Sequence, residues 1–258
     1  MSDAQSLEDH ALAMCTLASR TALRYFRGAL GIEFKPDESP VTQADRAVES
    51  AVRAYISAQF PQHGVFGEES GRSEGDGRHM WVIDPIDGTR SFLSGHPLFG
   101  FLLAHLVDGR AELGAVAMPV LGETYIGRPG AHATLNGQRI RVSDKSRLAE
   151  AILYVNEGDR LYRDHPDLFE RLMRAGQTRR FAYDCYPHAI LAAGHVDAVI
   201  DYGLQPYDFL ALAPLIEAAG GIITDWNGQR LGLESDGRVI AAATQALHDE
   251  MLKFVEGR

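Results

Sequence analysis

The sequence predicts an α/β protein with layered sheets in two halves, from three observations. Apolar residues recur with helical spacing up to about residue 60. Short strand-like segments joined by tight-turn signals follow, as expected for a meander of antiparallel strands. From about residue 150, strand-like segments alternate with helix-like ones. We therefore expect an N-terminal half at 1–142 and a C-terminal half at 143–258, with the boundary within 140–148.

Two helices open the chain in this prediction. The first is expected within 4–30, where the helical stripe consists of Leu7, Ala11, Met14, Ala18 and Ala22. The second is expected at 43–60, which carries a similar stripe. Short strands are then expected at 65–66, 80–83, 98–107, 111–118, 132–135 and 138–142. Two dipeptides favour tight hairpin turns between the last four strands, Asp108-Gly109 and Asn136-Gly137.

Strands and helices alternate in the second half. The strands are expected at 151–155, 178–182, 196–201, 222–224 and 238–242. The helices are expected at 166–175, 185–193, 207–219 and 244–255. Pro214 lies inside 207–219 and has no amide hydrogen to donate, so we expect a kink in that helix.

The composition is that of a globular protein without a basic surface for nucleic acid. The 258 residues are 45% hydrophobic and 23% charged, and 35 acidic residues outnumber 25 basic ones, giving a net charge of −10. The sequence contains neither the pattern of a signal peptide nor an apolar run of about 18 residues, so no membrane association is expected. Cys15 and Cys185 are too few for a disulfide framework and suggest packing residues in a cytoplasmic protein.

The stretch WVIDPIDGTR, residues 81–90, suggests a cation site. Pro85 favours extended geometry at Asp84 and removes a backbone donor, so we expect the strand to stop there. A turn after it would bring Asp84 and Asp87 to one side, together with the carbonyl of Ile86. Oxygen ligands of this kind suit Mg²⁺ or Mn²⁺. The alternative is a turn whose aspartates only cap a helix.

The residues after the aspartates suggest an anion site. Gly88 permits a tight turn, and Thr89, Arg90 and Ser91 resemble the first turn of a short helix. The amides of Gly88 and Thr89 would then face an anion, as the amides at helix N-termini do. Metal ligands and a phosphate cradle are thus expected within one short segment.

Further carboxylates strengthen this interpretation. Glu68 and Glu69 follow a short strand in FGEES, Asp208 begins a helix in QPYDFLALAP, and Thr42 and Asp45 precede the second helix in SPVTQAD. Each has a structural alternative, as a surface carboxylate or, for Asp208, as a helix N-cap. Clustered together, these carboxylates would have raised pKa values and would destabilise the fold unless divalent cations neutralise them. Carboxylates that bridge two or three metal ions are a device for phosphoryl transfer to water.

The blocks GEES, WVIDPIDGT, the aromatic-Asp pair before an apolar helix, and EAAGG resemble those of the inositol-monophosphatase-like, Mg²⁺-dependent phosphatases. The similarity runs over nearly the whole chain. It implies a five-layered α-β-α-β-α sandwich, usually a homodimer, that hydrolyses small phosphomonoesters with two or three Mg²⁺ ions per site, for which Mn²⁺ can substitute.

The resemblance also implies residue roles. A first Mg²⁺ would be bound by Glu68, Asp84 and the Ile86 carbonyl, and a second by Asp84, Asp87 and Asp208. Glu68 and Thr89 would position the attacking water, with Asp45 in the supporting hydrogen-bond network. Glu69 and Thr42 would lie behind these ligands, Glu69 orienting Glu68 or a third, weaker ion. Phosphate and substrate would contact Asp87, Gly88, Thr89, Arg179, Asp184, Asp201 and Asp208.

Some residues depart from the inositol phosphatases toward the histidinol-phosphate phosphatase branch of the family. Tyr207 stands where inositol phosphatases usually have Trp, and Ser91 stands where they usually have Asn. The segment DCYPHAILAAGHVDAVIDYGLQPYDFLAL resembles that branch, although Tyr183 replaces its usual Gly. Asp184 and Asp201 would face the ammonium and imidazole of histidinol phosphate. The alternative for Asp184 is a cap of the helix at 185–193.

Other functions fit less well. A haloacid-dehalogenase phosphatase needs D-x-D-G-T, one residue shorter than the D-x-x-D-G-T found here, and Cys15 stands one residue too close to Arg20 for a cysteine phosphatase. The histidines form no zinc motif, and structural roles are expected for His188 and His195. Inositol 1-phosphate, or a related sugar or polyol phosphate, stays as the alternative substrate. A non-catalytic, RNA-associated regulatory protein on the same fold would have lost its carboxylate ligands and gained a basic face.

Overall fold

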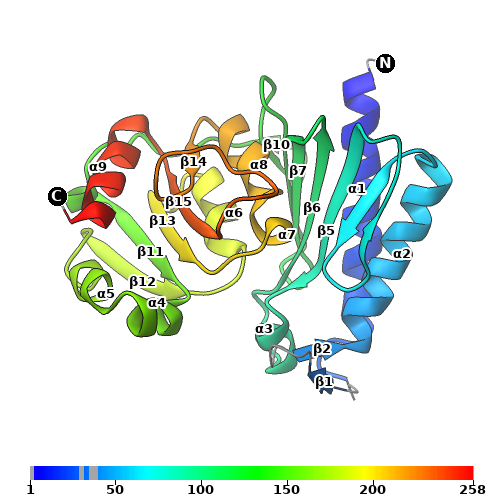
Figure 1. Cartoon of the computed structure of the whole chain (residues 1–258), viewed down its shortest axis with the longest axis horizontal. Helices are drawn as coiled ribbons and strands as arrows, with labels where there is room; N and C mark the ends of the chain where they lie inside the picture. The colour runs from blue at the N-terminus through cyan, green and yellow to red at the C-terminus, as the bar shows by residue number, and fades with distance from the viewer. Residues whose placement is uncertain (1–2, 29–31, 35–39, 258) are drawn as a thin grey trace.

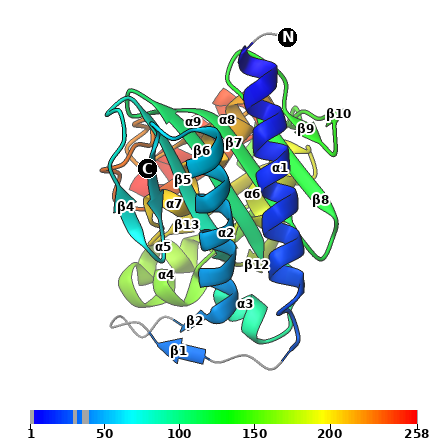
Figure 2. The same cartoon turned by 90° about the vertical axis from the view of Figure 1, so that its right-hand side faces the viewer.

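A computed structural model describes residues 3–28, 32–34 and 40–257. Its elements form five layers, alternately helical and sheet (Figure 1). The first layer consists of the helices α1 (Asp3–Leu23) and α2 (Gln43–Gln59), which lie side by side on the outer face of the larger sheet (Figure 2). The middle layer contains α6 (Tyr186–Ala192) and α8 (Leu212–Ala218). The fifth contains α4 (Gly158–Asp164), α5 (Pro166–Leu172) and α9 (Gln245–Glu256). The layered α/β prediction is confirmed.

The larger sheet has eight strands in the order β10-β9-β8-β7-β6-β5-β3-β4. Their bounds are β3 Gly64–Gly67, β4 Gly71–Ser73, β5 His79–Asp87, β6 Gly100–Val107, β7 Arg110–Met118, β8 Glu123–Gly127, β9 Thr134–Leu135 and β10 Gln138–Arg139. Only the β3–β5 pair is parallel among these neighbours. A separate small ribbon pairs β1 (Ile32–Phe34) with β2 (Pro40–Thr42).

The smaller sheet has five strands in the order β12-β11-β13-β15-β14. Their bounds are β11 Ile152–Asn156, β12 Thr178–Ala182, β13 Ala198–Tyr202, β14 Ile222–Thr224 and β15 Arg238–Ala242. β11 runs parallel to both β12 and β13, whereas β15 is antiparallel to its two neighbours. The carboxyl ends of β11, β12 and β13 therefore meet at one edge of this sheet.

Three apolar clusters hold the layers together. Trp81 and Ile83 of β5 pack toward α1 and α2, while Val82 between them packs toward the middle helices. The strand is buried on both faces, which explains why its residues 80–83 are all apolar instead of alternating with polar residues. The third cluster lies between the smaller sheet and the outer helices and includes Leu153 and Trp226. No described helix has the length and apolarity needed to cross a bilayer.

Tight turns and most elements agree with the sequence predictions. Both residues of Asp108-Gly109 and of Asn136-Gly137 have positive φ, as tight hairpin turns require. The first helix is shorter than the stripe within 4–30 suggested, because α1 ends at Leu23 and Arg27 has a φ of 58°. Residues 29–30 of that prediction lie outside the described part of the chain. The prediction omitted six described elements: β1, β2, β4, β8, α4 and the short 3-10 helix η1 (Leu148–Glu150).

The prediction that β5 stops at Pro85 was wrong. The strand continues to Asp87, but its register against β6 shifts, because Asp84 lies opposite Leu102 and Asp87 lies opposite Gly100. Pro85 has no amide hydrogen for the ladder, so pairing skips it and resumes two residues later. A bulge rather than a strand end therefore changes the alternation of side chains at this point.

The helix expected at 207–219 is two helices. α7 (Pro206–Phe209) ends before Leu210, and α8 begins at Leu212. Pro214 therefore lies in the first turn of α8, where a missing amide hydrogen costs little. In place of the expected kink, the helix is interrupted at Leu210 and Ala211, between two short helices.

A buried histidine makes stability depend on pH. His105 on β6 is 3% exposed, and its ring is stacked with those of His63 and His79. Burial, followed by the charges of those two histidines and Arg128, lowers the pKa of His105 to about 3. As pH falls below the ordinary value of 6.5, His105 binds a proton in the unfolded chain but not in the native state. Stability is therefore lost as pH falls from 6.5 toward about 3.

We expect His105→Leu to reduce this loss. Between about pH 7 and pH 5, the free energy of unfolding of the wild type should fall by about 2 kcal/mol more than that of the variant. Urea unfolding at the two pH values measures the difference, and His132→Leu at an exposed position is the matched control. Equal pH slopes for the wild type and His105→Leu would contradict the prediction.

Candidate active site

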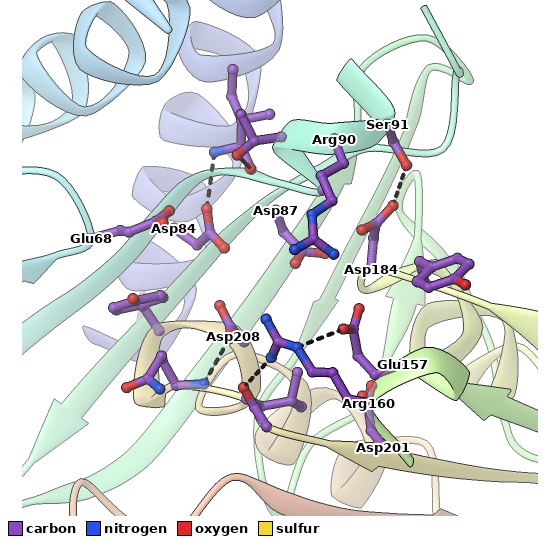
Figure 3. A pocket seen from close by; sticks show the side chains of 18 of the residues that line it. Glu68, Asp84, Asp87, Arg90, Ser91, Glu157, Arg160, Asp184, Asp201 and Asp208 are labelled. Carbon is purple, nitrogen blue, oxygen red and sulfur yellow. Dashed lines mark hydrogen bonds and ion pairs between the residues drawn. The ribbon is translucent and has the colours of Figure 1, made fainter. Parts of the chain in front are cut away.

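A cavity of about 690 Å³ lies where the two sheets approach each other. It is bordered by the ends of β3 and β5, by α3 (Thr89–Leu93), by α4 and α7, and by the residues that follow β12 and β13. Its lining is strongly acidic. The lining carboxylates are Glu68, Asp84, Asp87, Glu157, Asp159, Asp184, Asp201 and Asp208. Figure 3 shows Glu68, Asp84, Asp87 and Asp208 on one side and Glu157, Asp184 and Asp201 on the other.

Three carboxylates form a group suited to a cation. Asp84, Asp87 and Asp208 each offer one oxygen, and these oxygens lie within 4.8 Å of one another. Burial, then the charges of Glu68, Asp87 and Asp208, raise the pKa of Asp84 well above its ordinary value. Burial is also the main reason why the pKa of Asp208 rises to about 7. A cluster of oxygen ligands that resists ionisation on its own fits a hard divalent cation, which would neutralise it.

The bulge in β5 positions two members of this group. The amide of Ile86 donates to Asp84 Oδ1 over 3.0 Å, so the aspartate closes a small loop around Pro85. Asp87 accepts a hydrogen bond from the amide of Cys185, the N-cap residue of α6. One residue of the larger sheet thus binds the helix that starts beside the smaller sheet.

Asp208 enters the group from the start of α7. The N-cap of this helix is Gln205, not Asp208, so the N-cap alternative for Asp208 was wrong. Asp208 is the third helical residue, and its Oδ2 accepts the Gln205 amide over 2.7 Å in a capping box. This bond fixes the direction of the carboxylate that Asp208 contributes to the group with Asp84 and Asp87.

A hydroxyl and a buried carboxylate lie behind the bulge. Thr89 Oγ1 is 3.3 Å from Asp45 Oδ1 and 3.3 Å from the Ile86 carbonyl, and it has one hydrogen to donate between them. Asp45 is fully buried in the first turn of α2. Thr42 ends β2, but its side chain lies outside the described part of the structure. A hydroxyl that donates to a carboxylate can in turn accept a hydrogen bond from a water in the cavity, and it can take that water's proton if it passes its own to the carboxylate.

Asp184 faces the cavity from the residues after β12. Its φ is 64°, Ser91 Oγ donates to its carboxylate over 2.5 Å, and burial raises its pKa to about 6. A Cβ added at Gly88 would meet this carboxylate at 2.4 Å, so the glycine allows the close approach. The N-cap of α6 is Cys185 and has no side-chain cap, so the helix-cap alternative for Asp184 was wrong.

Asp201 is more enclosed than the sequence suggested. It is 2% exposed and accepts hydrogen bonds from the Asn156 side chain over 2.7 Å and from the Tyr202 amide over 2.9 Å. His188 Nε2, on α6, lies 3.1 Å from the same carboxylate. His188 is fully buried, in agreement with the structural role expected for it.

Several residues that line the cavity on the side of Asp184 and Asp201 were not predicted from the sequence. Glu157, with a φ of 48°, follows β11, and burial raises its pKa to about 7 although Arg160 opposes the rise. Arg160 Nε lies 3.1 Å from its carboxylate, and Arg160 Nη1 donates to the Gly203 carbonyl. Asp159 and Arg90 also line the cavity. A signal was present, because ligand sites form outside the carboxyl ends of parallel strands: Glu157 follows β11, Asp184 follows β12 closely, and Asp201 lies near the end of β13.

Three of the predicted site residues, Asp45, Glu69 and Arg179, are not among the described residues that line the cavity, and the side chain of a fourth, Thr42, lies outside the described part of the structure. Arg179 on β12 donates to the carbonyls of Ala175 and Gly176, and it is not among the described residues that line the cavity. Glu69 also does not line it, although its backbone lies next to Glu68. The remaining predicted residues, Glu68, Asp84, Ile86, Asp87, Gly88, Thr89, Asp184, Asp201 and Asp208, border the same cavity.

Comparison with known proteins agrees with this geometry. Residues 3–257 match the profile of the Inositol monophosphatase family. The chain is 38% identical to a histidinol-phosphatase from Chlorobaculum parvum, over 90% of both chains, and 36% identical to the Nus factor SuhB of Pseudomonas aeruginosa, over 84% of this chain and 83% of the relative. An inositol monophosphatase structure from Zymomonas mobilis covers 99% of this chain with all of its own, at a TM-score of 0.88 and 35% identity. The chain therefore belongs to the inositol monophosphatase family and is a phosphatase of the kind that acts on phosphomonoesters.

Proposed function

We propose that this protein hydrolyses L-histidinol phosphate to L-histidinol and phosphate, with Mg²⁺ as the cofactor, as a step of histidine biosynthesis. The observation that carries the choice of substrate is the second acidic wall of the cavity, formed by Glu157, Asp159, Asp184 and Asp201. Arg90 and Arg160 offset part of its charge. Histidinol carries an ammonium and an imidazole, which carboxylates bind well, whereas inositol offers only hydroxyl groups.

The residues that would bind the cations lie on the opposite side of the cavity. We call this side the first wall, and its carboxylates are Glu68, Asp84, Asp87 and Asp208. Glu68, Asp84 and the Ile86 carbonyl would hold one ion, and Asp84, Asp87 and Asp208 a second. When bound, divalent cations neutralise charge on the phosphoryl group and lower the pKa of water. The binding of two or three ions per site, and their replacement by Mn²⁺, remain predictions.

The chain's own groups would position the nucleophile and the phosphate. Thr89 accepts a proton from the attacking water while it donates to buried Asp45, and Glu68 orients the water from the opposite side. The turn at Gly88 and Thr89 directs backbone amides at the phosphate. Asp184 then faces the leaving alcohol.

The test is a phosphate-release assay across a substrate panel. It compares histidinol phosphate with inositol 1-phosphate, fructose 1,6-bisphosphate and phosphoadenosine phosphate in Mg²⁺. We expect the highest kcat/KM for histidinol phosphate. A higher value for inositol 1-phosphate would establish the alternative, which the Zymomonas mobilis relative favours.

Asp184→Ala tests the role of the second wall. A carboxylate facing a cation in a partly desolvated pocket is worth roughly 1.5–3 kcal/mol, or about 10- to 150-fold in binding. The variant should lose about 10- to 150-fold in kcat/KM for histidinol phosphate. It should keep its rate on an aryl phosphate whose aryl group carries no positive charge. Ser91→Ala, which removes only the hydroxyl bonded to Asp184, is the control for local disturbance. Equal losses on both substrates would remove the main physical reason for preferring histidinol.

A non-catalytic, RNA-associated role is the remaining alternative, and the Pseudomonas aeruginosa relative is named as a Nus factor. The net charge of −10 and the retention of every carboxylate in the first wall argue against it. An inactive protein that binds RNA in filter-binding assays at physiological salt would favour it. A homodimer in the cytoplasm stays a prediction that light scattering and fractionation can test.

A further inference from the structure

A buried glutamate lies behind the turn that carries Glu68. Glu49 on α2 is fully buried, and its carboxylate accepts the amide of Glu69 over 2.8 Å and the amide of Ser70 over 3.0 Å. Arg53, one turn later on the same helix, donates to it over 2.7 Å. Two consecutive backbone amides therefore converge on one side chain, which fixes the direction of the chain just after Glu68.

Other contacts close the same turn. Arg53 also donates to the Gly71 carbonyl, and the amide of Glu68 donates to the Ile83 carbonyl of β5 over 3.2 Å. Ile83 immediately precedes Asp84. The backbone of Glu68 is thus attached to β5 on one side and, through the next two amides, to α2 on the other.

The space for Glu49 depends on a glycine. A Cβ added at Gly67 would lie 2.5 Å from the Glu49 carboxylate, so only a glycine lets the carboxylate approach the turn this closely. Glu49 and Gly67 are not among the residues that line the cavity. Their contacts are with the turn and not with a substrate.

We propose that Glu49 is a positioning residue that holds the Glu68 carboxylate toward Asp84, and thereby sets the affinity of the site for its divalent cation. This inference rests on the proposed role of Glu68 as a metal ligand. Glu68, directly after β3, and Asp84, on the neighbouring strand β5, line the same cavity (Figure 3), and the charge of Glu68 contributes to the raised pKa of Asp84. A partner that orients a ligand typically changes metal affinity by about 10- to 100-fold when removed.

The position requires a carboxylate and not only a polar group. Three donors converge on Glu49: the amides of Glu69 and Ser70 and the guanidinium of Arg53. A glutamine has one acceptor oxygen, and its amino group would face at least one of these donors. The turn would then move to relieve the contact and would carry Glu68 with it.

The experiment measures Mn²⁺ binding to metal-free protein by electron paramagnetic resonance, together with the Mg²⁺ concentration that gives half-maximal activity. Glu49→Gln should raise both constants by about 10- to 100-fold, while kcat at saturating Mg²⁺ falls much less. Glu217→Gln is the matched control, because Glu217 is also paired with an arginine, Arg230, over 3.3 Å. It should leave both constants unchanged.

A double-mutant cycle identifies the route of the effect. If Glu49 acts through Glu68, Glu49→Gln should cause no further loss of Mn²⁺ affinity in a Glu68→Gln background. Additive losses, or unchanged affinity in folded Glu49→Gln, would overturn the inference. Unchanged affinity in Glu68→Gln would instead overturn the proposed metal ligand. Should Glu49→Gln not fold, Gly67→Ala tests the same carboxylate, because the added methyl group displaces it without removing its charge; unchanged affinity there overturns the inference as well.

Discussion

Asp84→Asn is expected to abolish turnover and to stabilise the metal-free protein. Asp84 is 2% exposed, and burial together with Glu68, Asp87 and Asp208 raises its pKa. A carboxyl group with a raised native pKa stabilises the fold at pH values below its ordinary pKa of 3.8, and that contribution is lost as pH rises toward the native value. Near neutral pH, removing the charge should therefore raise Tm by roughly 5 °C or more. The oxygen that accepts the Ile86 amide is retained in asparagine, so the bulge should persist.

The loss of activity has a separate cause. Without the Asp84 carboxylate both proposed cation sites lose a shared ligand, and the cation's contribution of several kcal/mol to the transition state corresponds to about 10³-fold or more in rate. Mg²⁺ should raise the Tm of the wild type, because it binds only the native state, and should raise that of Asp84→Asn much less.

Calorimetry in chelator and in excess Mg²⁺, with phosphate release under the same conditions, checks both parts. Asp144→Asn is the control, because Asp144 is exposed and is not among the described residues that line the cavity. Undiminished activity in excess chelator would rule out the metal-dependent mechanism. A lower Tm for metal-free Asp84→Asn would show that the cluster does not destabilise the apoprotein.

The first wall could be predicted from the sequence because its ligands lie in short segments with strong local signals. Asp84 and Asp87 are separated by a proline, and Asp208 follows a second proline at a helix start. The predicted mechanism for bringing the two aspartates together was nevertheless wrong in detail. A strand end and a bulge both interrupt pairing at a proline, and only the register of β6 opposite β5 distinguishes them.

The second wall, and Glu49 behind Glu68 of the first wall, could not be predicted in the same way. Glu157 follows a strand whose neighbours in the sheet are distant in sequence, so its position depends on the pairing of β11 with β12 and β13. Glu49 lies on a helix face that otherwise packs as core, where a lone acidic residue gives no indication of its partners. Glu49 acts through backbone amides of another segment, and such contacts leave no spacing pattern in the sequence.

Thr89→Val is expected to reduce kcat by about 10²-fold, the scale of a lost catalytic proton relay, while KM changes much less. The hydroxyl of Thr89 lies 3.3 Å from Asp45, and the N-cap of α3 is Gly88 without a side-chain cap, so the hydroxyl does not serve the helix. Valine keeps the shape of the side chain and removes only its hydrogen-bonding capacity. The melting temperature should therefore change little, and Thr89→Ser, which restores the hydroxyl, should recover most of the rate. Single-turnover phosphate release at saturating Mg²⁺ separates the chemical step from product release. Wild-type turnover in Thr89→Val would assign the attack to a water activated without this hydroxyl, and Asp45 would then be a buried structural carboxylate.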